Sequence, residues 1–156
     1  MPAKSTDVLP AKIVATSDAP TYRVHLRRLL SRSLVVPVQA NNKPFLFLLD
    51  TGASQSAFDS NRLHPATFGG KVEVLIYGAT VANRKTPVEW ARLRTLQVGE
   101  RKTSNFLISF VDLAFVNRSY RYYGDPPIDG ILGQDFLLQH RAVIDVGNNE
   151  LRFYDP

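Results

Sequence analysis

The sequence contains no cysteine and only three histidines among its 156 residues. A chain without cysteine can form no disulfide, cannot use a thiolate as a nucleophile and cannot hold zinc through sulfur. The spacing of His25, His64 and His140 does not match that of metal ligands, and no Asp or Glu pattern joins them. We therefore expect no metal site and no cofactor.

Long hydrophobic runs are also lacking. No stretch approaches the ~20 apolar residues that a membrane-spanning helix needs. The first residues, Met-Pro-Ala-Lys-Ser-Thr-Asp, do not contain the apolar core of a signal peptide. We expect a soluble protein of the cytoplasm with no membrane segment in this chain, and the sequence leaves open whether the natural N-terminus is longer.

The charge balance is basic, with a formal net charge of +5 and a pI near 9.7. Most basic residues are scattered, and one modest cluster comprises Arg27, Arg28 and Arg32. Residues 120–123 (YRYY) interleave aromatic rings with a cation, a pattern that would also suit single-stranded nucleic acid. A nucleic-acid-binding barrel would need a coherent positive face. We expect no nucleic-acid partner and interpret residues 117–127 as a loop near the mouth of a cleft.

The length suits one domain. Residues 1–20 are rich in Pro, Ala, Ser, Thr and charge, which predicts a flexible tail before a single domain over residues 21–156. Short apolar runs then alternate with Gly, Asn and Pro turns, a pattern typical of an all-β barrel or sandwich. The expected strands are 22–30, 34–39, 45–49, 72–77, 88–98, 105–110, 142–146 and 151–154, with turns at 40–44, 78–80, 99–100 and 147–149 and one short helix at 135–140.

The clearest chemical signal lies in residues 45–54 (FLFLLDTGAS), where Asp50 follows five apolar residues. Because burial of an unpaired charge is costly, we expect this carboxylate at a strand end that faces a cleft. Thr51 can hydrogen-bond to backbone and partner groups, and Gly52 lets the chain turn with no Cβ in the way. An ordinary strand and turn would also explain Asp-Thr-Gly alone, but the apolar run and the following Ala53-Ser54 favour a functional site.

A second segment, residues 128–135 (IDGILGQD), places Ile131 and Leu132 before Gly133. Alone, it would fit a plain strand that ends in a glycine turn. Together the two segments resemble the retropepsin-like aspartic peptidases, single-lobe relatives of pepsin, and their bacterial members in particular. The resemblance extends over most of the chain. It implies a small closed acid-protease barrel, with residues 50–54 as the active-site loop and Ile131-Leu132-Gly133 as a second signature packed behind it.

The sequence departs from the family pattern at two positions. Viral members usually carry an acidic residue after Asp-Thr-Gly-Ala and an arginine after the second-signature glycine, where this chain has Ser54 and Gln134. We expect a neutral hydrogen bond between these two side chains in place of an ion pair. The flap that covers the substrate is assigned to residues 76–83, although any hairpin would give this pattern. The substrate-binding residues near its tip are Tyr77, Gly78, Ala79 and Thr80.

Pepsin-like enzymes carry two Asp-Thr/Ser-Gly motifs in one chain, whereas this sequence carries one. Asp129-Gly130 lacks the middle residue, and the stretch from Asp145 to Gly147 has a valine in place of a hydroxyl. One motif per chain implies a two-fold homodimer in which the two copies of Asp50 face each other. The resemblance further implies that Thr51 and Gly52 support the dimer and that Ala53 and Ser54 line the substrate channel.

The resemblance implies an aspartic endopeptidase that acts on a peptide or protein substrate. Two such close carboxylates share one proton, because both cannot easily ionise. One then takes a proton from water while the other protonates the peptide carbonyl oxygen. The alternative is a retropepsin fold used for peptide binding or dimerisation with little catalysis. The intact residues 50–54 favour the enzyme, since a binding module needs no buried carboxylate pair.

Overall fold

The computed structural model describes residues 19–68, 73–75 and 88–155. The predicted tail (residues 1–18 of it) and the predicted flap at 76–83, with Tyr77, Gly78, Ala79 and Thr80, lie outside these ranges. The strands are β1 (Tyr22–His25), β2 (Arg27–Arg28), β3 (Leu34–Ala40), β4 (Lys43–Leu49), β5 (Ala57–Asp59), β6 (Glu73–Leu75), β7 (Val88–Val98), β8 (Arg101–Val111), β9 (Gly130–Leu132), β10 (Val143–Asp145) and β11 (Glu150–Phe153). The helices are α1 (Ala114–Tyr123), α2 (Gln134–Gln139) and a short 3-10 turn, η1 (Pro65–Phe68).

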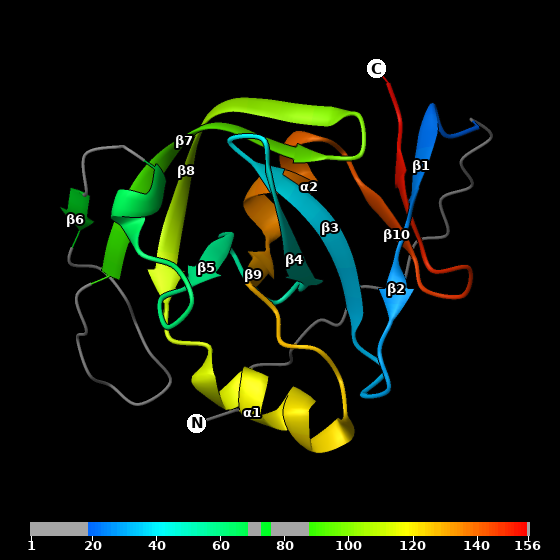
Figure 1. Cartoon of the computed structure of the whole chain (residues 1–156). Coiled ribbons are helices and arrows are strands. Elements are labelled where there is room, and N and C mark those ends of the chain that lie inside the picture. Colours follow the sequence, from blue (N-terminus) through cyan, green and yellow to red (C-terminus); the bar gives the residue numbers. More distant parts are fainter. Residues whose placement is uncertain (1–18, 69–72, 76–87, 156) are drawn as a thin grey trace, which may run out of the picture.

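Most of the described strands belong to one sheet with the order β2-β3-β4-β9-β5-β8-β7-β6. Strand β3 also pairs with β7, through Gln39 with Gln97 and Ala40 with Leu96. This extra pairing joins β3, β4, β9, β5, β8 and β7 into a closed ring, which Figure 1 shows from one side. The predicted small, closed all-β barrel is therefore confirmed.

The hairpin between β3 and β4 forms for a local reason. Asn41 and Asn42 have φ angles of 48° and 66°, and Ala40 pairs with Lys43 across the two-residue turn. Positive φ at both central residues gives a turn whose twist matches that of the strands, and asparagine tolerates this conformation. The turn predicted here is confirmed, and it sets the register that delivers β4 to Asp50.

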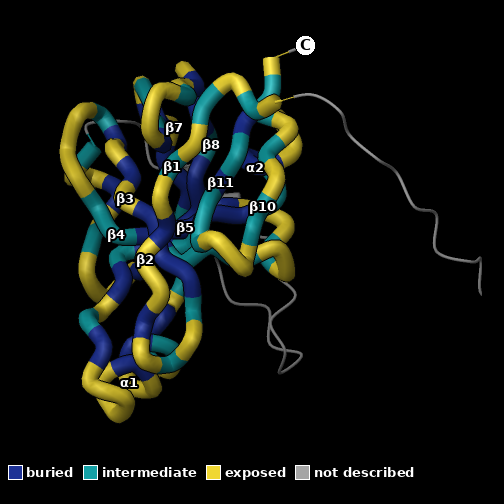
Figure 2. The backbone as a smooth tube through the Cα atoms, turned by 90° about the vertical axis from the view of Figure 1, so that its right-hand side faces the viewer, coloured by how far each residue is buried: buried dark blue, intermediate teal, exposed yellow. Residues whose placement is uncertain are grey.

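Strand β4 packs on both of its faces, as its unbroken apolar sequence predicts. Phe47 is fully buried in the barrel core, with its ring 5.1 Å from that of Phe58. On the opposite face, Leu46 and Leu48 pack against a smaller buried cluster that includes Tyr120 of α1. Figure 2 shows that the buried stretches of the chain run through the barrel and also reach the inner side of α1.

The chain ends of the described part meet in a separate three-stranded sheet of order β1-β11-β10. Tyr22 of β1 stacks on Phe153 of β11, with ring centroids 4.9 Å apart. The β10–β11 hairpin turns at the predicted position, where Asn149 adopts a φ of 54°. This sheet lies on the side of the barrel that faces the viewer in Figure 2.

The prediction of a loop over residues 117–127 is wrong for its first half, because residues 114–123 form α1. The Asp112 carboxylate accepts a hydrogen bond from the Ala114 N–H at the start of the helix, and Gly124 ends it with a φ of 80°. The expectation of a single helix is therefore also wrong, although the predicted short helix is present as α2. No helix in the described residues is long and apolar enough to cross a membrane.

Candidate active site

Asp50 is the first residue after β4, and it is half-buried. Its backbone N–H donates to the Leu132 carbonyl at 3.1 Å, which fixes the end of β4 against β9. The Gly52 N–H donates to Asp50 Oδ1 at 2.8 Å, so the loop itself orients the carboxylate. A Cβ on Gly52 would lie 3.1 Å from that same oxygen, closer than an ordinary contact. Within the described residues, no donor contacts the other carboxylate oxygen.

The second signature lies directly behind this loop. Strand β9 runs parallel to β4, with Ile131 beside Leu48 and Leu132 beside Leu49. A Cβ on Gly133 would lie 2.7 Å from the Gln55 carbonyl carbon and 2.8 Å from the Ala53 carbonyl oxygen. Only glycine therefore allows the junction between β9 and α2 to approach the loop so closely.

Side chains from α2 fasten the far side of the loop. The Asp135 carboxylate accepts hydrogen bonds from the Ser56 hydroxyl at 2.6 Å and the Ser56 N–H at 2.9 Å. The Ser56 hydroxyl oxygen in turn accepts from the Gly133 N–H at 3.0 Å. Sequence reasoning missed Ser56, whose signal is a small hydroxyl residue directly before a buried strand.

Gln134 makes a different contact from the one expected. Its backbone N–H donates to the Ala53 carbonyl, and its side-chain amide donates to the Thr51 carbonyl, both at 2.9 Å. The predicted hydrogen bond to Ser54 is therefore wrong. Gln134 still links α2 to the loop, because its side-chain amide donates to a backbone carbonyl, whereas the longer arginine of viral members would pair with a carboxylate.

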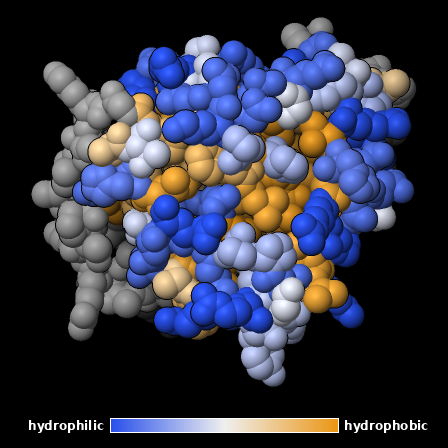
Figure 3. Space-filling view, viewed as in Figure 1, coloured by the Kyte–Doolittle hydropathy of each residue, from blue (hydrophilic) through white to orange (hydrophobic). Residues whose placement is uncertain are grey.

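The loop opens onto an apolar surface. Thr51, Gly52 and Ser54 are exposed, Ala53 is half-buried, and the Thr51 hydroxyl makes no hydrogen bond within the described residues. Figure 3, which has the same view as Figure 1, shows hydrophobic residues gathered near the middle, where β4 ends in Figure 1, and hydrophilic residues around them. Half-buried apolar side chains near the loop are Leu46, Leu48, Leu49 and Ile131.

The environment of Tyr120, on α1, shifts the pKa of its phenol. Burial raises the pKa of the Tyr120 phenol; a hydrogen bond with Ser33 opposes this, and the negative charges of Asp125 and Asp50 add to the rise. Tyr120 also packs in the apolar cluster beside Leu48. The helix that sequence reasoning missed therefore packs against the strand that leads to the candidate catalytic carboxylate.

The remaining candidates lie elsewhere in the fold. His140 ends α2, where its Nε2 lies 2.6 Å from the Thr103 hydroxyl, and His25 is exposed on β1. Among the described residues, no group of three or more His, Asp or Glu side chains comes together that could hold a metal ion.

Residues 36–136, well over half of the chain, match the aspartyl protease family. The chain belongs to this family. The match begins in β3, ends in α2 and includes both the Asp-Thr-Gly loop and the second signature, so the aspartyl protease assignment covers the whole site described above.

A solved structure of a retropepsin-like protease supports the fold, and two further solved structures are similar to parts of the chain. A retropepsin-like aspartic protease from Rickettsia conorii is 18% identical over 85% of this chain and 91% of its own, with a TM-score of 0.61. The protease of EIAV, complexed with the inhibitor HBY-793, is 21% identical over 67% and 85%, with a TM-score of 0.45. The retroviral protease-like domain of Ddi1 from Leishmania major is 20% identical over 79% and 94%, with a TM-score of 0.46. No curated protein is significantly similar in sequence.

Proposed function

We propose that this aspartyl protease family member is an endopeptidase that acts as a homodimer, with one Asp50 from each subunit in a shared catalytic dyad. The observation that carries the proposal is the position of Asp50. It follows a packed strand, its Oδ1 is held by the Gly52 N–H at 2.8 Å, and its loop is exposed. A carboxylate oriented by its own backbone is ready to act on a ligand without prior rearrangement.

In the proposed mechanism, the two carboxylates share one proton and hold one water between them. The ionised carboxylate takes a proton from the water, whose oxygen attacks the peptide carbonyl carbon. The protonated carboxyl gives its proton to the carbonyl oxygen. The tetrahedral species then breaks its C–N bond as the carboxyl that took the water's proton gives it to the nitrogen, while the other carboxylate takes a proton from a hydroxyl of the same carbon. This releases the two peptide products, restores the shared proton and needs no metal or covalent intermediate.

The dimer is supported by groups in one subunit that lack a partner within it. The chain carries one Asp-Thr-Gly motif, so a dyad needs a second copy. Thr51 is exposed with a free hydroxyl within the described residues, and the apolar surface around the loop would be covered by a partner or a substrate. Thr51 would then lock the two loops together, and Ala53 and Ser54 would line the channel for an extended peptide. Location in the cytoplasm remains part of this proposal.

The first test replaces Asp50 with Asn, which keeps the shape and the acceptor for the Gly52 N–H but removes the general base. Peptide-library cleavage should fall by about 10³-fold or more, while the thermal midpoint stays the same or rises. Cleavage by the parent should be highest in acid and fall as the second carboxylate of the pair ionises. Asp155→Asn makes the same change at an exposed carboxylate and should retain activity.

Mixing experiments test the shared dyad directly. An excess of Asp50→Asn subunits should inhibit the parent by forming mixed dimers with one carboxylate, whereas an excess of Asp155→Asn subunits should not. Sedimentation should show a dimer, alone or with a peptide inhibitor. A strictly monomeric protein that cleaves peptides would contradict the dimer, and equal cleavage by parent and Asp50→Asn would contradict the active site. Peptide binding without cleavage by the parent would favour the binding module.

A further inference from the structure

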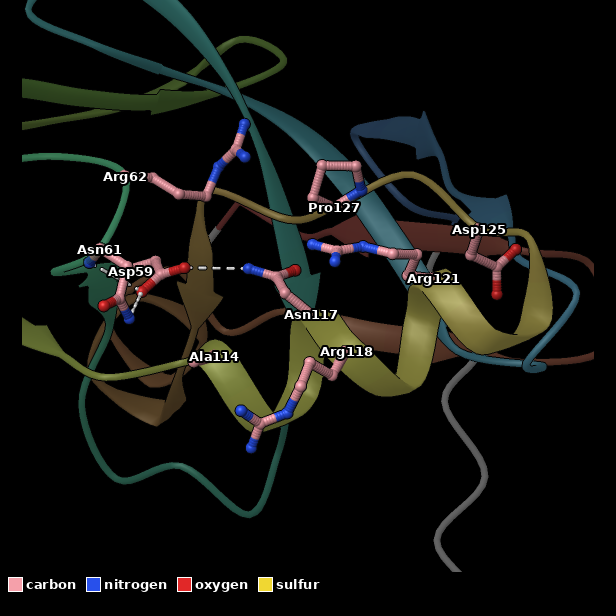
Figure 4. Close-up of a pocket in the computed structure, with 9 residues that line it drawn as sticks. All are labelled: Asp59, Asn61, Arg62, Ala114, Asn117, Arg118, Arg121, Asp125 and Pro127. Carbon is pink, nitrogen blue, oxygen red and sulfur yellow. Dashed lines mark hydrogen bonds between the residues drawn. The ribbon is translucent and has the colours of Figure 1, made fainter.

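A pocket of about 260 Å³ lies between the end of β5 and α1. Its lining contains none of the residues of the Asp50 loop, so it is a separate site (Figure 4). Seven of the nine lining residues carry polar or charged side chains: three arginines, two amides and two carboxylates. They are Arg62, Arg118, Arg121, Asn61, Asn117, Asp59 and Asp125.

The two carboxylates in the lining are already used by the fold. Asp59 is buried and accepts hydrogen bonds from the backbone N–H groups of Asn61 and Leu113 and from the Asn117 amide. Asp125 accepts from the backbone N–H groups of Leu30 and Ser31, at 2.7 Å and 2.8 Å. Neutral backbone and amide donors of the fold therefore hold both carboxylates in place.

Arg62 is already paired, because it binds the Asp129 carboxylate at 2.9 Å. The two arginines of α1, in contrast, are available to bind a ligand. Arg118 and Arg121 are exposed, and within the described residues no carboxylate lies within 4.0 Å of either guanidinium. Figure 4 shows Arg121 extending toward Asn117 and Pro127, with Arg118 at another edge of the pocket. Guanidinium groups present paired donors that match a carboxylate.

The frame that carries these arginines is held firmly. The Asn117 amide donates to Asp59 at 2.9 Å and to the Ile128 carbonyl at 3.1 Å, and its oxygen accepts from the Ile128 N–H at 2.8 Å. Asn117 thus joins α1 to β5 and to the segment that enters β9. Arg118 and Arg121 are one helical turn apart, so their positions follow from the helix.

The same helix borders the catalytic strands. Its inner side packs with Leu48 of β4 and Ile131 of β9. We propose that the α1 pocket binds acidic side chains of the protein substrate, in a segment outside the residues held at the cleavage site. This inference rests on the proposed peptidase function for the identity of the ligand, while the binding itself can be measured without catalysis.

The test uses the full chain with Asp50→Asn, so that peptides bind without being cleaved. The probe is a fluorescein-labelled peptide that carries four consecutive glutamates. Adding Arg118→Gln and Arg121→Gln should raise the Kd about three- to tenfold, because glutamine keeps helix propensity but removes both charges. The control adds Arg92→Gln and Arg94→Gln, which remove two exposed charges from β7 and should leave the Kd nearly unchanged.

Three further arms sharpen the result. Arg118→Lys with Arg121→Lys should lose less affinity than the glutamine pair, since charge remains without the paired donors. A matched peptide with four glutamines should bind more weakly than the glutamate peptide. In active protein, a substrate with a glutamate flank should be cleaved with a lower KM than its glutamine-flanked twin, and the pocket variant should erase that difference.

The inference fails if the pocket and control variants weaken binding equally, which would indicate general charge, or if neither does. Displacement of the peptide by free glutamate at the same carboxylate concentration would indicate a small-anion site and would also overturn it. An active enzyme that shows no pocket-dependent preference for acidic flanks contradicts this inference and leaves the proposed function intact. Pocket-dependent binding by a protein without peptidase activity contradicts the proposed function and the substrate identity instead.

Discussion

Two regions around Asp50 are held together by different means. At the junction of the loop with α2, backbone meets backbone, and a Cβ on Gly133 would lie 2.7 Å from the Gln55 carbonyl carbon. At α1, one buried amide, Asn117, bridges Asp59 and Ile128. The junction therefore depends on the absence of a side chain, and the helix on the presence of one. Substitutions that block the close approach and substitutions that remove the hydrogen bonds should therefore change stability and cleavage rate in different proportions.

The largest effect is expected at the junction, from Gly133→Ala. The added methyl meets three backbone atoms that cannot move without displacing the loop. We expect a loss of about 3 kcal/mol in the free energy of unfolding and about 100-fold in cleavage rate, because small displacements of catalytic groups are costly. Urea unfolding and peptide cleavage measure the two effects.

Gly147→Ala is the matched control for that substitution. A Cβ there would come no closer than 3.5 Å to its nearest neighbour, Asp145 Oδ1, which is an ordinary contact. This variant should retain stability and activity. Similar losses in both variants would show that flexibility of glycine, rather than close approach at Gly133, accounts for the effect.

A smaller effect is expected at the helix, from Asn117→Ala. The substitution leaves the Ile128 N–H without its acceptor and removes one donor from the buried Asp59 carboxylate. The free energy of unfolding should fall by about 2 kcal/mol. The cleavage rate of the folded protein should change little, in contrast to Gly133→Ala, while binding of the glutamate peptide weakens. Ser119→Ala, on the exposed side of α1, should do neither.

The smallest effect concerns the far end of α2. Burial, together with the charge of Arg101, lowers the pKa of His140. The unfolded chain therefore binds a proton at a higher pH than the folded one, and stability should fall as the pH drops below about 6.5 toward the folded pKa. His140→Gln should reduce this loss between pH 7.5 and 5 in thermal melts. His25→Gln, at an exposed position, should follow the parent; identical curves for all three proteins would contradict the assignment.

The sequence predicted the junction better than the helix for a physical reason. The apolar run of β4, the Asn41-Asn42 turn and the close-packed Gly133 each reflect a local requirement that one or two residue types satisfy. The signals for α1 were also present, in Asp112 before the helix and Gly124 after it. They were obscured by the aromatic and arginine residues between them, and Asn117, which holds the helix, acts through contacts with Asp59 and Ile128 that the sequence does not place.

The Ser54 and Gln134 positions show a limit of a different kind. We interpreted Ser54 and Gln134 as one exchanged pair and therefore predicted a contact between their side chains. In the structure, Gln134 finds the Thr51 carbonyl instead. The partner of a side chain can be a backbone group whose position the sequence does not give. A paired substitution therefore indicates that two residues lie near each other, but not that they share a hydrogen bond.

The parallel pairing of β4 with β9 also has a consequence for biosynthesis. Asp50 is fixed by Leu132, and Thr51 is bound by a residue 83 positions further along the chain. At roughly 5–20 residues per second, the ribosome needs about 4 to 17 s to make that interval. Throughout this time β4 lacks β9 beside it, and the loop that carries Asp50 lacks Gly133 behind it. A peptidase built in this way would be inert until the ribosome had passed the second signature.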